Sequence, residues 1–194
     1  VMLGVLEGLH AAHHALDVNG ESLNLVHRDI SPENVMVGAD GVARITDFGV
    51  AKARGRLHTT RDSSVKGKLA YMAPEQLRSE PVTALADLYS AAATLWELLT
   101  GRRAFSGDSE GQIAMRVLSG QVQPPSAFVP SLVPAIDAFV LRGLHPTPGG
   151  RFPSARAMAD ELRRVIPPAT TEEVAAWVEL RGGQALAERD AIVR

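Results

Sequence analysis

A short hairpin signal with polar residues at both of its ends constrains this chain more than any other feature. Two β-type runs, Val35–Val37 and Val42–Ile45, flank the turn sequence Gly38-Ala39-Asp40-Gly41. Such runs around an Asp-Gly pair predict an antiparallel hairpin. Asn34 comes just before the hairpin and Asp47 follows it closely. Because a hairpin returns the chain to its starting point, we expect these two side chains to lie side by side.

The residues around the hairpin predict a particular chemistry. Asp29 closes the triplet His27-Arg28-Asp29 and precedes Asn34 by five positions. Carboxylate and amide oxygens are ligands that suit Mg²⁺, and a carboxylate can also accept a proton. Phosphoryl transfer from a nucleotide such as ATP needs these groups, because its catalysis is mostly positioning and neutralisation of charge. We therefore expect Asp29 to be catalytic, and Asn34 and Asp47 to bind the cofactor and its metal.

Composition narrows the class of protein. The chain has 194 residues, of which 45% are hydrophobic, and this predicts a packed globular core. A net charge of −2 argues against nucleic acid as a partner. The absence of cysteine excludes disulfides and fits a cytoplasmic location. The apolar run Leu85–Leu99 contains Asp87 and Glu97 and is shorter than the ~20 residues of a membrane span, so it predicts a buried helix and no membrane segment.

Most of the remaining chain has helical signals. We expect a helix over residues 1–16, a short strand at Leu25-Val26, a long functional loop from Val50 to Met72, and a short helix that begins at 73–75. Further helices are predicted from the caps Thr83 (ending at Gly101), Asp108 (ending at Gly120) and Ser154 (running to Ile166), and around residues 133–140. A capping box at Thr170 and Glu173 predicts a tail helix that stops near Gly182-Gly183, with Trp96 packing in the core and Trp177 in the tail.

Five segments in order carry a resemblance to a known family. They are His27-Arg28-Asp29-Ile30-Ser31-Pro32-Glu33-Asn34, Asp47-Phe48-Gly49, Ala73-Pro74-Glu75, Asp87-Leu88-Tyr89-Ser90 and Arg151-Phe152. The chain resembles the C-terminal lobe of a eukaryotic-type (Hanks-type) bacterial serine/threonine protein kinase. The resemblance covers residues 1–166 and implies a mainly α fold, a helical lobe with one small hairpin that belongs to a larger α+β kinase fold. Residues 167–194 lie outside it as a C-terminal extension.

The resemblance also implies roles for individual residues. Asp29 would orient the hydroxyl of a protein substrate and accept its proton, while Asn34 and Asp47 would bind Mg²⁺ on the phosphates of ATP. Arg28 would pair with a phosphate on the long loop, where the candidate phosphorylation sites are Thr59, Thr60, Ser63 and Ser64. The structural residues implied are His27, Phe48 and Gly49 at the site, Asp87 bracing the backbone of residues 27–29, and Glu75 with Arg151 as a buried ion pair.

The sequence departs from the family in two ways. The three lysines, Lys52, Lys66 and Lys68, all follow Asp29, so we expect the ATP-clamping N-terminal lobe to be absent and the isolated chain to be inactive. Ser31 also stands where the family usually has lysine, and Lys68 stands where it usually has threonine. We hypothesise that this pair is exchanged, so that Lys68 reaches the migrating phosphate from the opposite wall. The alternative is that Ser31 is a simple loss and Lys68 is a solvated loop residue.

Other readings remain open. The chain could be a truncated or pseudokinase-like module that only binds partners. A small-molecule phosphotransferase of the aminoglycoside type also uses an Asp-Asn-Asp core, but it lacks the long loop that ends in Ala-Pro-Glu. His10, His13 and His14 recur at helical spacing, which is more typical of one packed helix face than of a metal site.

Overall fold

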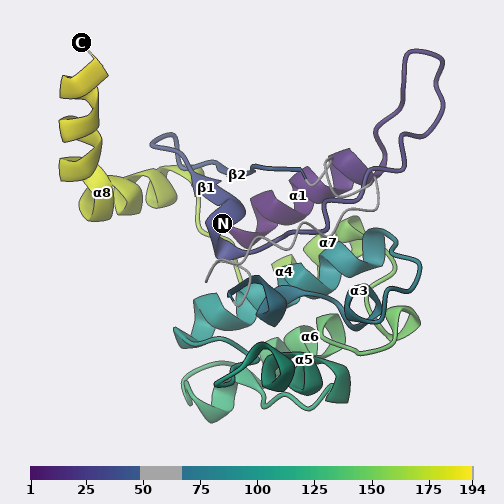
Figure 1. The fold of residues 1–194 in the computed structure, drawn as a ribbon. Helices are drawn as coiled ribbons and strands as arrows, with labels where there is room; N and C mark the ends of the chain where they lie inside the picture. Colours follow the sequence, from purple (N-terminus) through teal and green to yellow (C-terminus); the bar gives the residue numbers. More distant parts are fainter. Residues whose placement is uncertain (49–66, 194) are drawn as a thin grey trace.

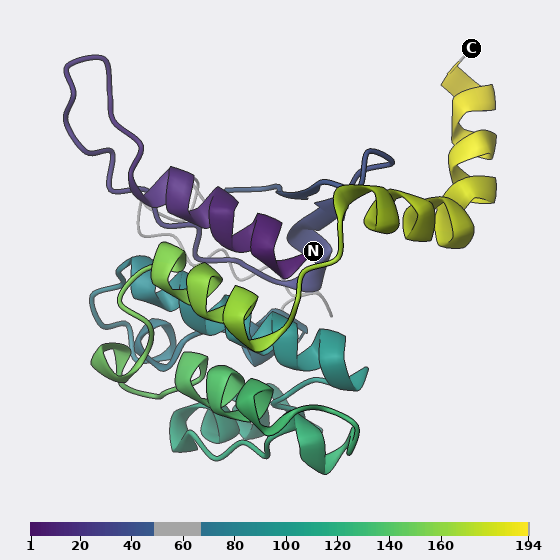
Figure 2. The same cartoon turned by 180° about the vertical axis from the view of Figure 1, so that it is seen from behind.

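The computed structural model describes residues 1–48 and 67–193, and in this part stacked layers of helices form the body. Helix α1 (Met2–His13) lies in one layer with the hairpin, and α4 (Ala84–Thr100) and α7 (Ala155–Val165) lie beneath it (Figures 1 and 2). Helices α5 (Glu110–Ser119) and α6 (Pro134–Gly143) form the next layer. Helix α1 packs on α4, α7 and the hairpin, which joins the site-bearing segment to the body.

The hairpin forms as the turn signal predicts. Strand β1 (Val35–Val37) pairs antiparallel with β2 (Ala43–Ile45), with Val35 opposite Ile45. Gly41 takes a φ of 75° in the turn, a conformation that glycine adopts without steric cost. Strand β2 approaches α1 closely at Gly4, where an added Cβ would lie 3.0 Å from the carbonyl oxygen of Ala43. The hairpin therefore lies against a helix instead of standing free in solvent.

Helix α4 is the central element of the core. Every residue from Ala86 to Trp96 is buried. The hydroxyl of Thr83 caps its N-terminus by accepting from the amide of Leu85, and Gly101 ends it with a left-handed φ of 69°. Two of its buried hydroxyls are paired within the protein, since Ser90 donates to the carbonyl of Tyr71 and Thr94 to that of Ser90. The predicted buried helix, with its cap and its stop, is confirmed.

Short elements complete the fold. A helix, α3 (Pro74–Leu77), starts in the predicted Ala-Pro-Glu segment, and α8 (Thr171–Val193) forms the extension. Single 3-10 turns occur at η1 (Pro32–Asn34), η3 (Leu69–Tyr71), η4 (Pro125–Ala127) and η5 (Pro148–Gly150). In the part of the chain that the structure describes, the fold is thus mainly helical with one small antiparallel sheet, as the sequence predicts.

Several predicted details are wrong. Helix α1 ends at His13 instead of 16, because the chain turns into a projecting loop in which Leu16 pairs with Ser22 (Figure 1). The pair Leu25-Val26 is not a strand, since no neighbouring strand pairs with it. The N-cap of α5 is Ser109 instead of Asp108, because the Ser109 hydroxyl is the group that reaches the amide of Gln112, at 3.3 Å.

The C-terminal extension differs from the prediction at its far end. The capping box forms, since Thr170 Oγ1 accepts from the amide of Glu173 and the Glu173 carboxylate accepts from the amide of Thr170. Helix α8 then continues past Gly182 and Gly183, and its ribbon bends (Figures 1 and 2). Glycine lowers helix propensity by about 1 kcal/mol, which is not enough to stop a helix here. Trp177 remains 54% exposed instead of packing fully, whereas Trp96 is buried as predicted. None of the described helices is long and apolar enough to cross a membrane.

Candidate functional site

A buried carboxylate on α4 holds the backbone of residues 27–29. Asp87 is fully buried, and its Oδ2 and Oδ1 accept from the amides of His27 at 2.9 Å and Arg28 at 2.7 Å. Oδ2 also contacts Nε2 of His13, the last residue of α1, at 2.8 Å. A buried carboxylate without partners would be very costly, so these three contacts explain how Asp87 can occupy the core. They attach the segment firmly to two helices.

Two of the predicted site residues have unusual backbone conformations. The φ of Arg28 is 67° and that of Asp47 is 58°, in the left-handed region that residues with a side chain rarely occupy. Such residues cost about 1–3 kcal/mol each and persist only where the surroundings hold them. Arg28 is held on both sides, because Asp87 accepts from its amide and Gln76 Nε2 donates to its carbonyl at 3.0 Å.

His27 connects this segment to the end of the hairpin. Its ring is buried, with Nε2 2.9 Å from the carbonyl oxygen of Thr46 and Nδ1 accepting from the amide of Asp29. These two contacts fix the tautomer, with the proton on Nε2. The amide of Thr46 in turn donates to the carbonyl of Asn34 at 3.0 Å. The hairpin therefore places Asn34 across from Thr46, the residue before Asp47, as its sequence predicts.

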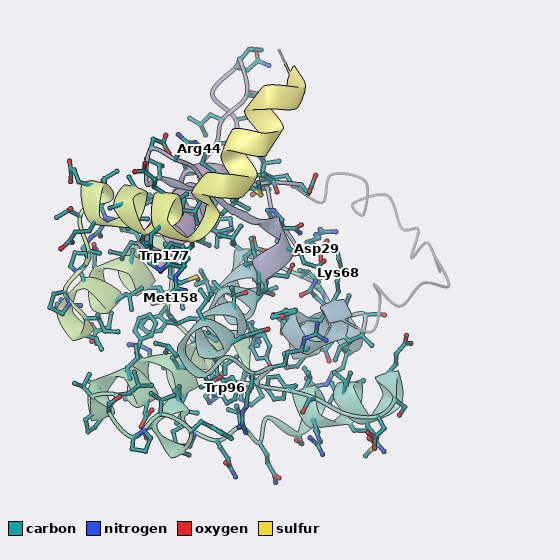
Figure 3. The ribbon with its side chains drawn as sticks, turned by 90° about the vertical axis from the view of Figure 1, so that its left-hand side faces the viewer. Asp29, Arg44, Lys68, Trp96, Met158 and Trp177 are labelled. Atoms are coloured by element: carbon teal, nitrogen blue, oxygen red, sulfur yellow. The ribbon has the colours of Figure 1, made fainter. Side chains whose placement is uncertain are left out.

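The side chain of Asp29 has a cation and an amide beside it. Lys68 Nζ lies 2.7 Å from Asp29 Oδ2, and Asn34 Nδ2 donates to the carbonyl of Asp29 at 2.6 Å. Figure 3 shows Asp29 and Lys68 pointing toward one another at the edge of the body. The Asp29 side chain is only 13% exposed and that of Lys68 30% exposed, so water screens this ion pair incompletely.

The donor atoms at the site fit a hard divalent cation. The amide nitrogen of Asn34 is used by Asp29, which leaves the amide oxygen as the atom suited to a metal. The Asp47 residue is exposed beside the hairpin end, and its carboxylate is a second hard oxygen donor. Phe48 packs its ring against that of His27, with centroids 4.6 Å apart. No described contact joins the Asp47 carboxylate to Asn34 or to Asp29, so their convergence on one ion stays a prediction.

The other half of the hypothesised exchange forms no hydrogen bond with Lys68. The hydroxyl of Ser31 is buried and has no hydrogen-bond partner among residues 1–48 and 67–193. Lys68 itself contacts Asp29, and the exchange of the two residues stays a prediction.

Comparison with known proteins gives the family. The family model described as the protein kinase domain matches residues 1–162, more than four-fifths of the chain. The chain belongs to the protein kinase family. The membership that the motifs predict, among bacterial kinases of the Hanks type, is thereby confirmed.

Individual relatives of this kinase domain are bacterial. Tyrosine-protein kinase MasK of Myxococcus xanthus is 40% identical over 166 residues, covering 86% of the chain and 26% of MasK. The probable serine/threonine-protein kinase PknB of Bifidobacterium longum is 38% identical over 164 residues, covering 84% of the chain and 23% of PknB. Serine/threonine-protein kinase PknL of Mycobacterium tuberculosis is 35% identical over 165 residues, covering 85% of the chain and 39% of PknL. The chain therefore spans well under half the length of each.

A buried ion pair joins distant parts of the kinase domain. Arg151 donates from Nη1 and Nη2 to the two carboxylate oxygens of Glu75 at 2.7 and 2.8 Å. Its remaining donors reach the carbonyls of Leu85, His145 and Pro146, and its guanidinium lies over the ring of Tyr89. The predicted contact is thus present, and every side of the guanidinium has a partner.

The sequence did not indicate two of the residues that position the site. His13 was interpreted only as part of a packed helix face, yet it contacts Asp87. Gln76 donates to the carbonyl of Arg28 and accepts from the amide of Ala73, which its place after the Ala-Pro-Glu segment does not reveal. His10, His13 and His14 belong to no cluster of metal-binding residues within the described chain. Gly49 and the candidate phosphorylation sites Thr59, Thr60, Ser63 and Ser64 lie outside the described residues.

Proposed function

We propose that this chain is the catalytic region of an ATP- and Mg²⁺-dependent kinase that phosphorylates serine or threonine hydroxyls of protein substrates. One observation supports this most strongly: Asp29 lies between the ammonium of Lys68 at 2.7 Å and the side chain of Asn34, which bonds to its carbonyl. In the proposal Asn34 and Asp47 would hold Mg²⁺, whose charge stabilises the phosphates during transfer.

In this proposal Asp29, Lys68 and Arg28 would each have a separate role in the reaction. Asp29 would orient the substrate hydroxyl and accept its proton as the hydroxyl oxygen bonds to the γ-phosphorus. The bond from that phosphorus to the β–γ bridging oxygen breaks, and ADP leaves. Lys68 would neutralise the migrating group from its position beside Asp29, in place of the lysine that the family usually has at position 31. Arg28 would pair with a phosphate on the segment that contains Thr59 and Ser63.

The proposal also includes a second lobe. The glycine-rich loop and the lysine that clamp the phosphates of ATP in the family are not found before Asp29, because Lys52, Lys66 and Lys68 all follow it and Gly4, Gly8 and Gly20 lack the spacing of such a loop. We propose that an N-terminal lobe supplies these groups and that the 194-residue chain alone is inactive. A cytoplasmic location belongs to the same proposal, with the cysteine-free composition as its support.

Lysine substitutions in the complete enzyme test the proposed role of Lys68. We expect Lys68→Thr to lower the rate of phosphate transfer from labelled ATP by about 10²-fold, as for loss of one transition-state charge contact. Lys66→Thr makes the same change two positions away and should leave the rate within about twofold of the unsubstituted enzyme. Equal rates for the two variants would refute the exchange of Ser31 and Lys68.

The same assay tests the proposed reaction as a whole. Asp29→Asn should reduce transfer by about 10²–10⁴-fold, the usual contribution of a catalytic acid or base. Acid hydrolysis of the labelled product should give phosphoserine or phosphothreonine. Phosphotyrosine would correct the substrate class, and an unsubstituted enzyme that transfers no more phosphate than Asp29→Asn would favour a partner-binding module.

A further inference from the structure

A cavity on the far side of the Gly67–Tyr71 segment has three arginines around it. The cavity has a volume of about 670 Å³ and is lined by Arg102, Arg103 and Arg116, with Trp96 and Phe128 among the apolar residues. The arginines come from the turn after α4 and from α5, so two different elements direct positive charge to one hollow.

The charge of these arginines is not neutralised locally. None of the three forms an ion pair with a carboxylate in the described part of the chain, although six other arginines there do so. Arg103 contacts the hydroxyl of Tyr71, and that hydroxyl donates to the carboxylate of Glu97. Arg102 is held over the ring of Phe128, with 5.5 Å from Cζ to the centroid, so it stands at the rim of an aromatic surface.

The cavity adjoins the proposed active site through two consecutive residues. A Cβ on Gly67 would lie 3.4 Å from Nη2 of Arg103, so the guanidinium of Arg103 is beside the backbone there. Lys68, the next residue, contacts Asp29. Arg103 therefore joins the lining of the cavity to the segment that carries Lys68.

We infer that this cavity, which we call the basic cavity, binds acidic residues flanking the hydroxyl that is phosphorylated, and so selects acidic segments of protein substrates. The inference rests on the proposed kinase function and adds the substrate class. Charge complementarity selects this occupant, because a guanidinium binds a carboxylate with paired hydrogen bonds and the hollow offers several. The exposed aromatic ring of Phe128 gives the peptide backbone or an apolar neighbour a surface on which to pack.

Binding of peptides to the 194-residue chain tests this without any phosphate transfer. The probe is a labelled peptide with one serine followed by a run of glutamates, compared by fluorescence anisotropy with a peptide that has glutamines instead. We expect the glutamate peptide to bind at least about tenfold more tightly, and this difference to shrink as ionic strength rises from about 0.05 to about 0.5 M. Equal affinity for the two peptides would overturn the inference.

Matched variants locate the binding. All three arginines are exposed, so their substitution is expected to leave the fold intact. The double variant Arg102→Gln, Arg116→Gln should bind the glutamate peptide about tenfold more weakly. The control double variant Arg78→Gln, Arg164→Gln removes the same charge elsewhere and should change the affinity for this peptide less than about twofold. Equal losses in the two double variants would show a general charge effect and refute the site.

A second measurement reports on the cavity itself. Trp96 lines the basic cavity, and the sequence contains one further tryptophan, Trp177. In a Trp177→Phe background, addition of the glutamate peptide should change the emission of Trp96, and the glutamine peptide should not. An unchanged emission with tight anisotropy binding would place the peptide elsewhere and refute the inference. Loss of phosphate transfer in the complete enzyme with peptide binding intact would instead count against the proposed function alone.

Discussion

Individual residues of the candidate site have a strained backbone or a buried charge, and hydrogen bonds to neighbouring residues stabilise them there. Arg28 has a left-handed backbone, and Asp87 and Gln76 bind its amide and its carbonyl. Asp87 in turn remains in the core because two amides and the ring of His13 surround its oxygens. Loss of one acceptor oxygen should therefore destabilise several of its hydrogen-bond partners together.

Replacing Asp87 tests this dependence. Asp87→Asn keeps the shape of the side chain but exchanges one acceptor oxygen for a donor, so a buried amide or His13 loses its partner. We expect the free energy of unfolding in urea to fall by about 1–3 kcal/mol. Asp160→Asn removes a half-exposed carboxylate on α7 and should change stability by less than about 0.5 kcal/mol. A loss of the same size in both variants would contradict the anchoring role of Asp87.

At the scale of elements, the hairpin depends on its turn as well as on its strands. Arg44 donates to both oxygens of Asp40, across the turn, and the amide of Val42 donates to the same carboxylate. These contacts, with the hydrogen bond from Arg44 the largest, lower the pKa of Asp40 from its ordinary 3.8 to about 2. The turn therefore keeps its ion pair in mild acid.

The pH dependence of the hairpin follows from this lowered pKa. Between pH 3.8 and about 2 the folded chain keeps Asp40 ionised while the unfolded chain protonates it. The stabilisation is complete above the unfolded pKa and is lost as pH falls through the folded one. A carboxyl titration by NMR should give a midpoint near 2 for Asp40, and Arg44→Gln should raise it toward 3.8. A midpoint unaffected by Arg44→Gln would assign the shift to the backbone alone.

At the scale of the whole molecule, one ion pair connects segments far apart in sequence. Glu75 lies at the start of α3 and Arg151 precedes α7, and the pair is almost completely buried. Arg151 also donates to the carbonyl of Leu85 in α4, so it joins three regions of the helical body. A buried ion pair stabilises the fold little more than two apolar residues in its place would. Removal of only one partner is costly, because the other charge then stays buried and unpaired.

A double-mutant cycle tests this view. Arg151→Met leaves the Glu75 carboxylate buried without its cation and should lower the free energy of unfolding by about 3–5 kcal/mol. Glu75→Gln combined with Arg151→Met should cost clearly less than the sum of the two single variants, because no unpaired charge remains. Calorimetric or urea unfolding of the four proteins gives the coupling energy. Simple additivity would show that the pair does not act as a unit.

The local features of the fold could be read from the sequence because they depend on neighbouring residues. The Asp-Gly turn, the Thr83 cap and the Gly101 stop each act within a few positions, and the hairpin brings Asn34 opposite Thr46 as expected. The ordered segments that contain Asp29, Asn34, Asp47 and Glu75 also predicted the family. Where a local signal is weak, the prediction was wrong, as at Gly182, because glycine only lowers helix propensity.

Contacts between distant residues were decided only by the tertiary structure. The contact of His13 with Asp87 and the hydrogen bond from Gln76 to Arg28 join residues 74 and 48 positions apart. The basic cavity likewise brings Arg102 and Arg116 together from a turn and a helix. No sequence period encodes such contacts, because they arise from how helices pack around the buried α4. The sequence by itself determined the family and predicted the residues of the candidate site, and packing determined which side chains hold those residues in place.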